Sequence, residues 1–136
     1  MIPSDRGSMW RKWDLQVHTP HSHLNNSFGA DFRAYFSQLL IKAEHLKIAT
    51  VGLTDYFTIE GYKEAIGLLA DPEFLDILPV DRVRAYAKRL LILPNVELRT
   101  NFLIQDKNGK DGRVNMHVIF SNAVSSAEIE EHFFEK

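Results

Sequence analysis

The chain has 136 residues, of which 45% are hydrophobic and 25% charged, proportions typical of one globular domain with a single core. A net charge of −2 argues against a broadly basic nucleic-acid-binding surface, and the lack of cysteine excludes disulfides and thiolate zinc sites. No apolar run reaches the length of about 18 residues that a membrane helix needs, and no signal-peptide core is visible, so we expect a cytoplasmic protein. Residues 1–9 have no apolar period and are expected to be a disordered or tag-like extension.

The first predicted elements are a strand, a helix and a second strand. Trp13–His18 alternates weakly between apolar and polar residues before a proline, which predicts a short strand that ends at His18. Apolar residues then recur at steps of three and four, the spacing of an amphipathic helix, which we expect at about Asp31–Lys47. Ile48–Leu53 is an uninterrupted apolar run that favours a parallel strand covered by helices, and Asp55 follows it as His18 follows the first strand.

The middle of the chain is predicted to be helical and to lead into a third strand. One helix is expected at about 59–69, and a charged helical stretch at 71–88 is interrupted by a proline, which opens a helical turn more easily than it continues one. The apolar segment 90–98 predicts the third strand, and Glu97 lies near its end. Pro94 predicts an irregularity in this strand.

The last third predicts a β-hairpin and a final helix. Thr100–Gln105 and Val114–Phe120 are both strand-like, and an Asn-Gly pair between them is a hairpin turn signal. His117 lies in the second arm of this hairpin near residues 100–120. A serine at 125 or 126 is expected to cap a helix at Ala127–Phe134.

The alternation of strands and helices predicts an α/β fold with a mostly parallel sheet. Ligands in such folds collect at the carboxyl ends of the strands. His18, Asp55 and Glu97 all map to strand ends, and His117 is within reach of the same edge. The sequence therefore predicts a metal or acid–base site at this edge of the sheet.

A histidine-rich turn follows the first predicted strand. Three of the six histidines, His18, His21 and His23, fall within six residues. Neutral imidazole is the commonest metal ligand, so the cluster suits a metal site. The alternative interpretation is a polar surface turn that binds nothing.

Four stretches, DLQVHTPHS, GLTDYFTIEGY, PNVELR and NMHVIF, resemble in this order the motifs of the PHP (polymerase and histidinol phosphatase) domain. More narrowly, they resemble the PHP domain at the N-terminus of bacterial SMC-like or AAA-type ATPases linked to DNA repair or defence. The similarity runs from about Trp10 to Phe120. It implies that residues 10–136 form the N-terminal portion of a PHP-like domain, a partial (β/α)7 barrel, and it implies an attached ATPase as a partner.

The resemblance implies hydrolysis of a phosphoester, such as a small phosphomonoester or a DNA 3′ end, by a divalent metal cluster in which zinc or manganese is expected. His18 matches the second histidine of the family's His-x-His motif, Glu97 the glutamate that bridges two metals, and His117 a later histidine ligand. Asp55 matches the aspartate of the Thr-Asp-His motif and is grouped with His18 and Glu97 as catalytic. His21 or His23 is the candidate for a further loop ligand, and we take His23 as the fourth metal residue.

Two substituted residues and a missing last part separate this sequence from the family pattern, so the resemblance implies an incomplete metal cluster. Gln16 stands where the first histidine of His-x-His is expected, and glutamine is a poor zinc ligand. Tyr56 stands where the histidine of Thr-Asp-His is expected, and a tyrosine binds metal only as phenolate, with an ordinary pKa of about 10. The family's last motifs have no counterpart before Lys136.

Three hypotheses follow. The first is a metal-dependent phosphoesterase or nuclease domain. The second is a degenerate, catalytically inactive PHP module with a structural or regulatory role for an attached ATPase. The third is an α/β domain without a site, in which Asp55 caps a segment, Glu97 forms an ion pair and His117 is a hydrogen-bonded sheet residue. An incomplete sheet also exposes an edge, which predicts self-association.

Overall fold

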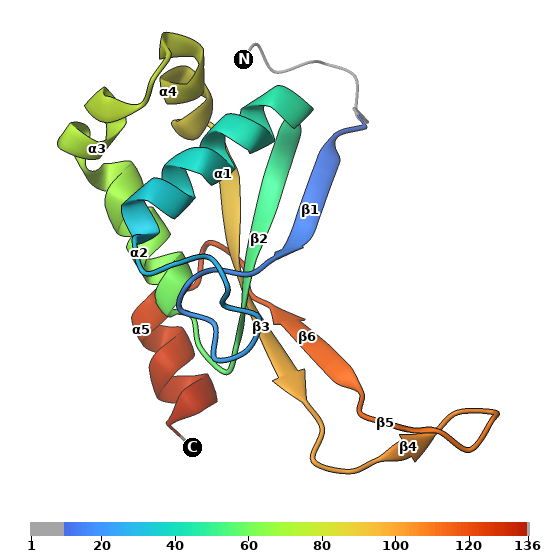
Figure 1. Ribbon diagram of the computed structural model, residues 1–136. Helices are drawn as coiled ribbons and strands as arrows, with labels where there is room; N and C mark the ends of the chain where they lie inside the picture. Colours follow the sequence, from blue (N-terminus) through green and yellow to red (C-terminus); the bar gives the residue numbers. More distant parts are fainter. Residues whose placement is uncertain (1–9, 136) are drawn as a thin grey trace.

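A curled sheet of four strands, shaped like half of a barrel, is the centre of this mixed α/β structure (Figure 1). The structure is a computed structural model that describes residues 10–135, so the expectation for residues 1–9 lies outside the described residues. The strand order is β1-β2-β3-β6. β1 (Lys12–Val17), β2 (Ile48–Tyr56) and β3 (Leu91–Arg99) run parallel, and β6 (Asn115–Ile119) pairs antiparallel with β3.

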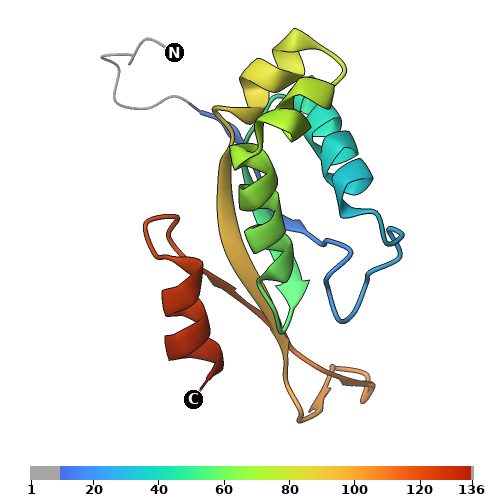
Figure 2. The same ribbon diagram turned by 90° about the vertical axis from the view of Figure 1, so that its left-hand side faces the viewer.

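Helices α1 to α4 gather on one face of this sheet (Figures 1 and 2). Their bounds are α1 (Phe32–Leu46), α2 (Glu60–Ala70), α3 (Pro72–Ile77) and α4 (Asp81–Ala87). The last helix, α5 (Ser126–Ile129), continues as a π-helical turn (Glu130–Phe134), and Lys63 of α2 forms an ion pair with Glu130. No helix among the described residues is long and apolar enough to cross a membrane.

Helix α1 begins and ends at residues whose backbone or side chain caps the helix. The Asp31 side chain accepts a hydrogen bond from the Ala34 backbone N–H and so caps the first turn. At the other end Lys47 takes a left-handed conformation, with φ of 57°, and its N–H donates to two carbonyls of the last turn. The predicted helix Asp31–Lys47 is confirmed to within one residue at each end.

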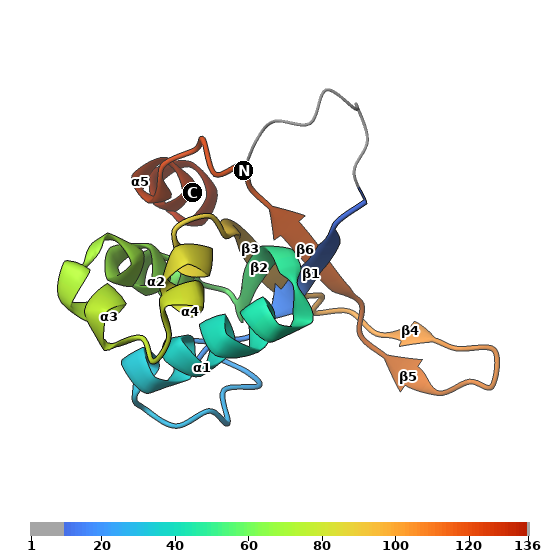
Figure 3. The same cartoon turned by 90° about the horizontal axis from the view of Figure 1, so that it is seen from above.

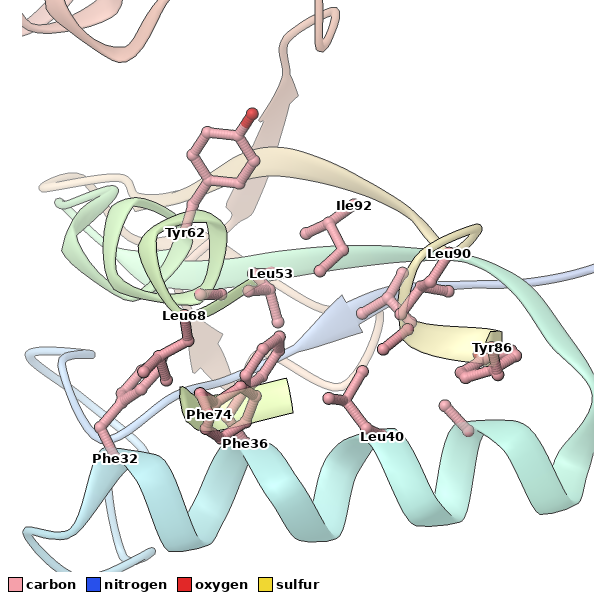
Figure 4. Packing of buried hydrophobic residues seen from close by; sticks show 14 of the residues in the cluster. Phe32, Phe36, Leu40, Leu53, Tyr62, Leu68, Phe74, Tyr86, Leu90 and Ile92 are labelled. Atoms are coloured by element: carbon pink, nitrogen blue, oxygen red, sulfur yellow. The ribbon is translucent and has the colours of Figure 1, made fainter. Parts of the chain in front are cut away.

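The hydrophobic core lies between this helical layer and the sheet (Figure 4). Phe36 and Leu40 of α1 and Phe74 of α3 are fully buried, and they face Leu53 of β2 and Val96 of β3 within one cluster. Each such side chain contributes about 1.5–3 kcal/mol by leaving water. The core therefore fixes which face of β2 and β3 is covered.

The irregularity predicted at Pro94 is wrong, because β3 is continuous from Leu91 to Arg99. The Pro94 carbonyl accepts from the Phe120 backbone N–H, just beyond the ladder between β3 and β6, which begins at the pair of Asn95 and Ile119. The edge of β3 at which Pro94 lacks an N–H therefore faces Phe120, which lies one residue beyond the end of β6. Proline removes no ladder hydrogen bond there.

The hairpin predicted from Thr100–Gln105 and Val114–Phe120 is present only in part, because most of its second arm forms β6, which pairs with β3. Only β4 (Ile104–Gln105) is a strand within 100–105, and it pairs with β5 (Asp111–Gly112). Asp106 organises the turn by accepting from the backbone N–H groups of Asn108 and Lys110. The two-stranded arm projects away from the rest of the molecule, as Figure 3 shows. Because no third strand of the described chain packs beside it, longer strands in this arm would gain little stability.

A close approach between α2 and the loop after β1 predicts the effect of two glycine substitutions. A Cβ at Gly61 would collide with the Thr19 hydroxyl and the Asp55 carboxylate, both of which are buried, whereas a Cβ at Gly67 meets nothing within 4 Å. We expect Gly61→Ala to destabilise the fold by about 1–3 kcal/mol or more. Gly67→Ala, in the same helix, is expected to stabilise it by about 0.5–1 kcal/mol. Urea unfolding measures both, and equal effects would contradict this packing.

Candidate functional site

The pairing of β2, β3 and β6 brings polar residues from three strands to one edge of the sheet. Tyr56 at the end of β2 is paired in register with Glu97 of β3, and Glu97 lies opposite His117 of β6. His18 directly follows β1. Because side chains alternate along a strand, Glu97 lies on the face opposite to that of the core residue Val96.

Glu97 is the centre of the arrangement and its side chain is 1% exposed. Its Oε1 atom accepts hydrogen bonds from the Tyr56 hydroxyl and from Asn115 Nδ2, each at 2.6 Å. Its Oε2 atom receives no hydrogen bond from any described residue. His18 Nε2 lies 3.3 Å from this second oxygen, and His117 Nε2 lies 3.9 Å from the first. One buried carboxylate therefore faces two imidazoles.

The His18 ring is held in place by its neighbours. It stacks on the Tyr56 ring with 5.4 Å between centroids and 5° between planes. The Tyr35 hydroxyl of α1 donates to the His18 carbonyl oxygen at 2.5 Å. The buried Nδ1 atom of His18 has no hydrogen-bond partner among the described residues. The imidazole is thus fixed in orientation, with Nε2 toward Glu97.

Tyr56 acts as a hydrogen-bond donor in this arrangement. Burial raises the pKa of its phenol above 10.0, and the hydrogen bond to Glu97 and the charge of that carboxylate raise it further, while Arg99 and Asn115 oppose the change. A protonated phenol cannot bind a metal as phenolate. Tyr56 therefore stabilises the Glu97 carboxylate by a hydrogen bond and does not act as a metal ligand itself.

Two asparagines complete the network, and sequence reasoning missed the role of both. Asn95 Nδ2 donates to the Leu15 carbonyl at 2.7 Å and to Thr54 Oγ1 at 2.8 Å, and it lies 3.3 Å from His117 Nδ1. Asn115 Nδ2 also donates to the Tyr56 hydroxyl at 2.9 Å. The signal was present, because each asparagine lies two residues before a site residue on the same face of its strand.

Asp55 does not join the cluster around Glu97. Its carboxylate accepts from the backbone N–H of Thr19 at 2.8 Å and from the Thr19 hydroxyl at 2.7 Å, and it lies against Gly61 of α2. The alternation of β2 places Asp55 on the helix-covered face, whereas Tyr56 is on the face of Glu97. Burial raises the pKa of Asp55 above 3.8, and the two Thr19 hydrogen bonds oppose this rise.

The other two histidines of the turn lie apart from Glu97. His21 forms an exposed ion pair with Glu64 of α2, with 2.5 Å between Nε2 and Oε2. His23 is exposed, and no hydrogen bond or ion pair in the described part of the chain joins it to the cluster. The three histidines that are clustered in the sequence therefore lie in three different environments in the structure.

Cavities flank the cluster on two sides. One of about 250 Å³ is lined by Trp13, Gln16, Asn95, His117 and Ile119, among others. A larger one of about 800 Å³ lies between β1 and α1 and also reaches Gln16 and His18. Gln16 thus lies beside the site and is exposed.

The donor set fits a divalent cation only in part. Imidazole nitrogen and carboxylate oxygen are suitable ligands for zinc and manganese, and Glu97 Oε2 with His18 Nε2 supplies one of each. Across residues 10–135, however, no group of three or more histidine, aspartate or glutamate side chains is arranged to hold a metal ion. The side chains in their present positions provide two adjacent candidate ligands, His18 and Glu97, and lack a third among the described residues.

Comparison with known proteins yields no relative. No protein-family model matches the sequence, and no curated protein or solved structure matches it. The arguments on function therefore rest on the residues and their geometry.

The contact between Thr19 and Asp55 predicts a pH-dependent stability. The hydroxyl of Thr19 opposes the rise in the Asp55 pKa, so Thr19→Val should raise that pKa further and destabilise the fold at pH 7 by about 1–3 kcal/mol. A folded-state pKa above the unfolded value gives stability that is full below 3.8 and lost as the pH rises through the folded pKa. The loss should therefore be smaller in acid than at neutral pH.

Urea unfolding over this pH range measures the effect of Thr19→Val. Thr19→Ser is the matched control, since it retains the hydroxyl and should retain the pH profile of the natural sequence. A loss of the same size at every pH would show that the hydroxyl does not act through the Asp55 carboxylate.

Proposed function

We propose that this chain is part of a metal-dependent phosphoesterase or nuclease domain of the PHP type. His18 and Glu97 would hold a divalent zinc or manganese ion, and His117, on the other oxygen of Glu97, would be the next ligand. The observation that carries the proposal is Glu97 Oε2, a buried carboxylate oxygen that receives no hydrogen bond from the described residues and faces an imidazole nitrogen 3.3 Å away.

A buried carboxylate with one unpaired oxygen is costly, because removing a charge from water is repaid only by hydrogen bonds or an opposite charge. A divalent cation at Oε2 supplies that charge. When bound, the metal lowers the pKa of a coordinated water toward neutrality and offsets the charge that develops on a phosphoester.

The remaining residues position these ligands. Tyr56 and Asn115 occupy Glu97 Oε1 and so leave Oε2 for the cation. Asp55 holds Thr19, the residue after His18, and fixes the start of the loop. Asp55 thus contributes to the site by positioning His18.

The second candidate is a degenerate PHP module without catalysis, which supports or regulates an attached ATPase. Two observations favour it. The Tyr56 hydroxyl binds Glu97 as a protonated donor, and the described residues contain no three-ligand group for a metal. On this view, the network around Glu97 stabilises the end of the sheet.

The setting of the domain follows from the resemblance of its motifs. We propose a cytoplasmic protein, with a phosphoester such as DNA as substrate and an ATPase as partner. The free edges of β1 and β6 in the sheet support self-association as a further property.

Metal binding separates the two candidates. If the first is right, the protein binds about one zinc or manganese ion per chain, and His18→Ala or Glu97→Gln weakens the affinity by about 10- to 100-fold or more, because each removes a ligand. His45→Ala is the matched control, since His45 is exposed at the end of α1, and it should change nothing. Calorimetric titration and elemental analysis measure the binding.

Hydrolysis of a chromogenic phosphomonoester and of single-stranded DNA by the metal-loaded protein completes this test. Turnover that disappears in Glu97→Gln and persists in His45→Ala supports the phosphoesterase. A folded protein that binds no metal, or turnover that is unchanged in Glu97→Gln, would sink it and leave the degenerate module.

The degenerate candidate makes a prediction of its own for Gln16. Gln16→His adds an imidazole beside His117 at an exposed position, so we expect a gain in zinc affinity of about tenfold or more. Gln105→His, which adds an exposed imidazole on β4, away from both cavities, is the control and should give no gain. Calorimetric zinc titration is the measurement, and equal affinities for the two variants would show that Gln16 is not the missing ligand.

A further inference from the structure

Arg99, at the end of β3, is held next to the site by two of its residues. It follows Glu97 by two positions, so both side chains lie on the same face of the strand. The Arg99 Nε atom donates to Asn115 Oδ1 at 3.2 Å, and its guanidinium carbon lies 5.8 Å from the centroid of the Tyr56 ring. A hydrogen bond and a cation–π contact together restrict the guanidinium.

Asn115 links this cation to the buried carboxylate. Its Nδ2 atom donates to Glu97 Oε1 while its Oδ1 atom accepts from Arg99, so one amide orients both charged groups. The two charges are thus neighbours that do not neutralise each other in a direct ion pair. The position of the guanidinium relative to Glu97 is fixed by the pairing of β3 with β6, in which Arg99 lies opposite Asn115.

Arg99 differs from three other arginines of the described chain in its lack of an acidic partner. Arg33, Arg82 and Arg84 each form an ion pair with a carboxylate. Across residues 10–135 no carboxylate forms an ion pair with Arg99, and its two terminal NH₂ groups donate no hydrogen bond. An exposed, oriented guanidinium with two unused donor groups is suited to an oxyanion.

We propose that Arg99 binds the phosphoryl oxygens of an anionic phosphomonoester and positions the phosphorus next to Glu97 and His18. This inference rests on the proposed function for its location, since it adds a substrate-binding residue to the same site. Planar guanidinium matches two phosphoryl oxygens in a paired geometry, which lysine does not reproduce. Arg99 is thereby a determinant of specificity for a terminal phosphate.

Binding of phenylphosphonate, a non-hydrolysable phosphomonoester analogue, tests the proposal in the presence and absence of zinc. We expect Arg99→Gln to weaken phenylphosphonate binding about tenfold or more, and Arg99→Lys to restore it only in part. Arg113→Gln is the matched control, because it removes the same charge from an exposed arginine beside the β5 strand and should change binding less than twofold. Calorimetry or an NMR titration gives the dissociation constants.

Equal losses in Arg99→Gln and Arg113→Gln would overturn the proposal, because they would show a general charge effect. The result also separates it from the proposed function. Phenylphosphonate binding that depends on Arg99 in a protein that binds no zinc supports the inference while the phosphoesterase fails. Zinc binding and turnover with an unchanged phenylphosphonate affinity and an unchanged KM in Arg99→Gln would refute the inference while the phosphoesterase stands.

Discussion

The hydrogen bonds between the buried Asp55 carboxylate and Thr19 are the contact on which the site end of the molecule depends. They join the loop after β1 to the end of strand β2, and Gly61 lets α2 approach both residues. His18 directly precedes Thr19, so the same contact sets where its imidazole lies. Without the contact between Asp55 and Thr19, His18 would precede a loop whose later residues are exposed, and its position would be less restricted. A buried carboxyl group on the helix-covered face of the sheet thus helps to position His18, whose imidazole lies near Glu97 on the opposite face.

Because side chains alternate along β2 and β3, one face of the sheet packs against the core and the other holds the polar residues around Glu97. Val96 enters the core, and Glu97 is directed to the other side, where Tyr56 and Asn115 satisfy one of its oxygens. Each residue is buried, but for a different reason. Val96 gains by leaving water, whereas the charge of Glu97 is costly to bury and is held there by neighbours that the core itself places. Stability of the core and geometry of the site therefore come from the same register.

The sequence predicted the elements more fully than it predicted their contacts. Helix α1 was located through its apolar spacing, which is a local signal, and the structure adds the cap at Asp31. The irregularity at Pro94 was a wrong prediction, because the cost of a proline depends on whether a neighbouring strand needs its N–H at that point. The roles of Asn95 and Asn115 were missed for a related reason, since an amide shows its partners only when the strands are paired.

What the sequence determined by itself was the order of strands and helices, the presence of His18 and Glu97 near strand ends and that of His117 within a strand, because periodicity acts within a few residues of the chain. Only the tertiary structure decided which of these groups meet. It placed Asp55 on the helix-covered face, kept His23 exposed, and brought Arg99 and Tyr56 to the neighbourhood of Glu97. The reason is physical, since the face and the neighbours of a strand residue depend on register and pairing with segments that are distant in sequence.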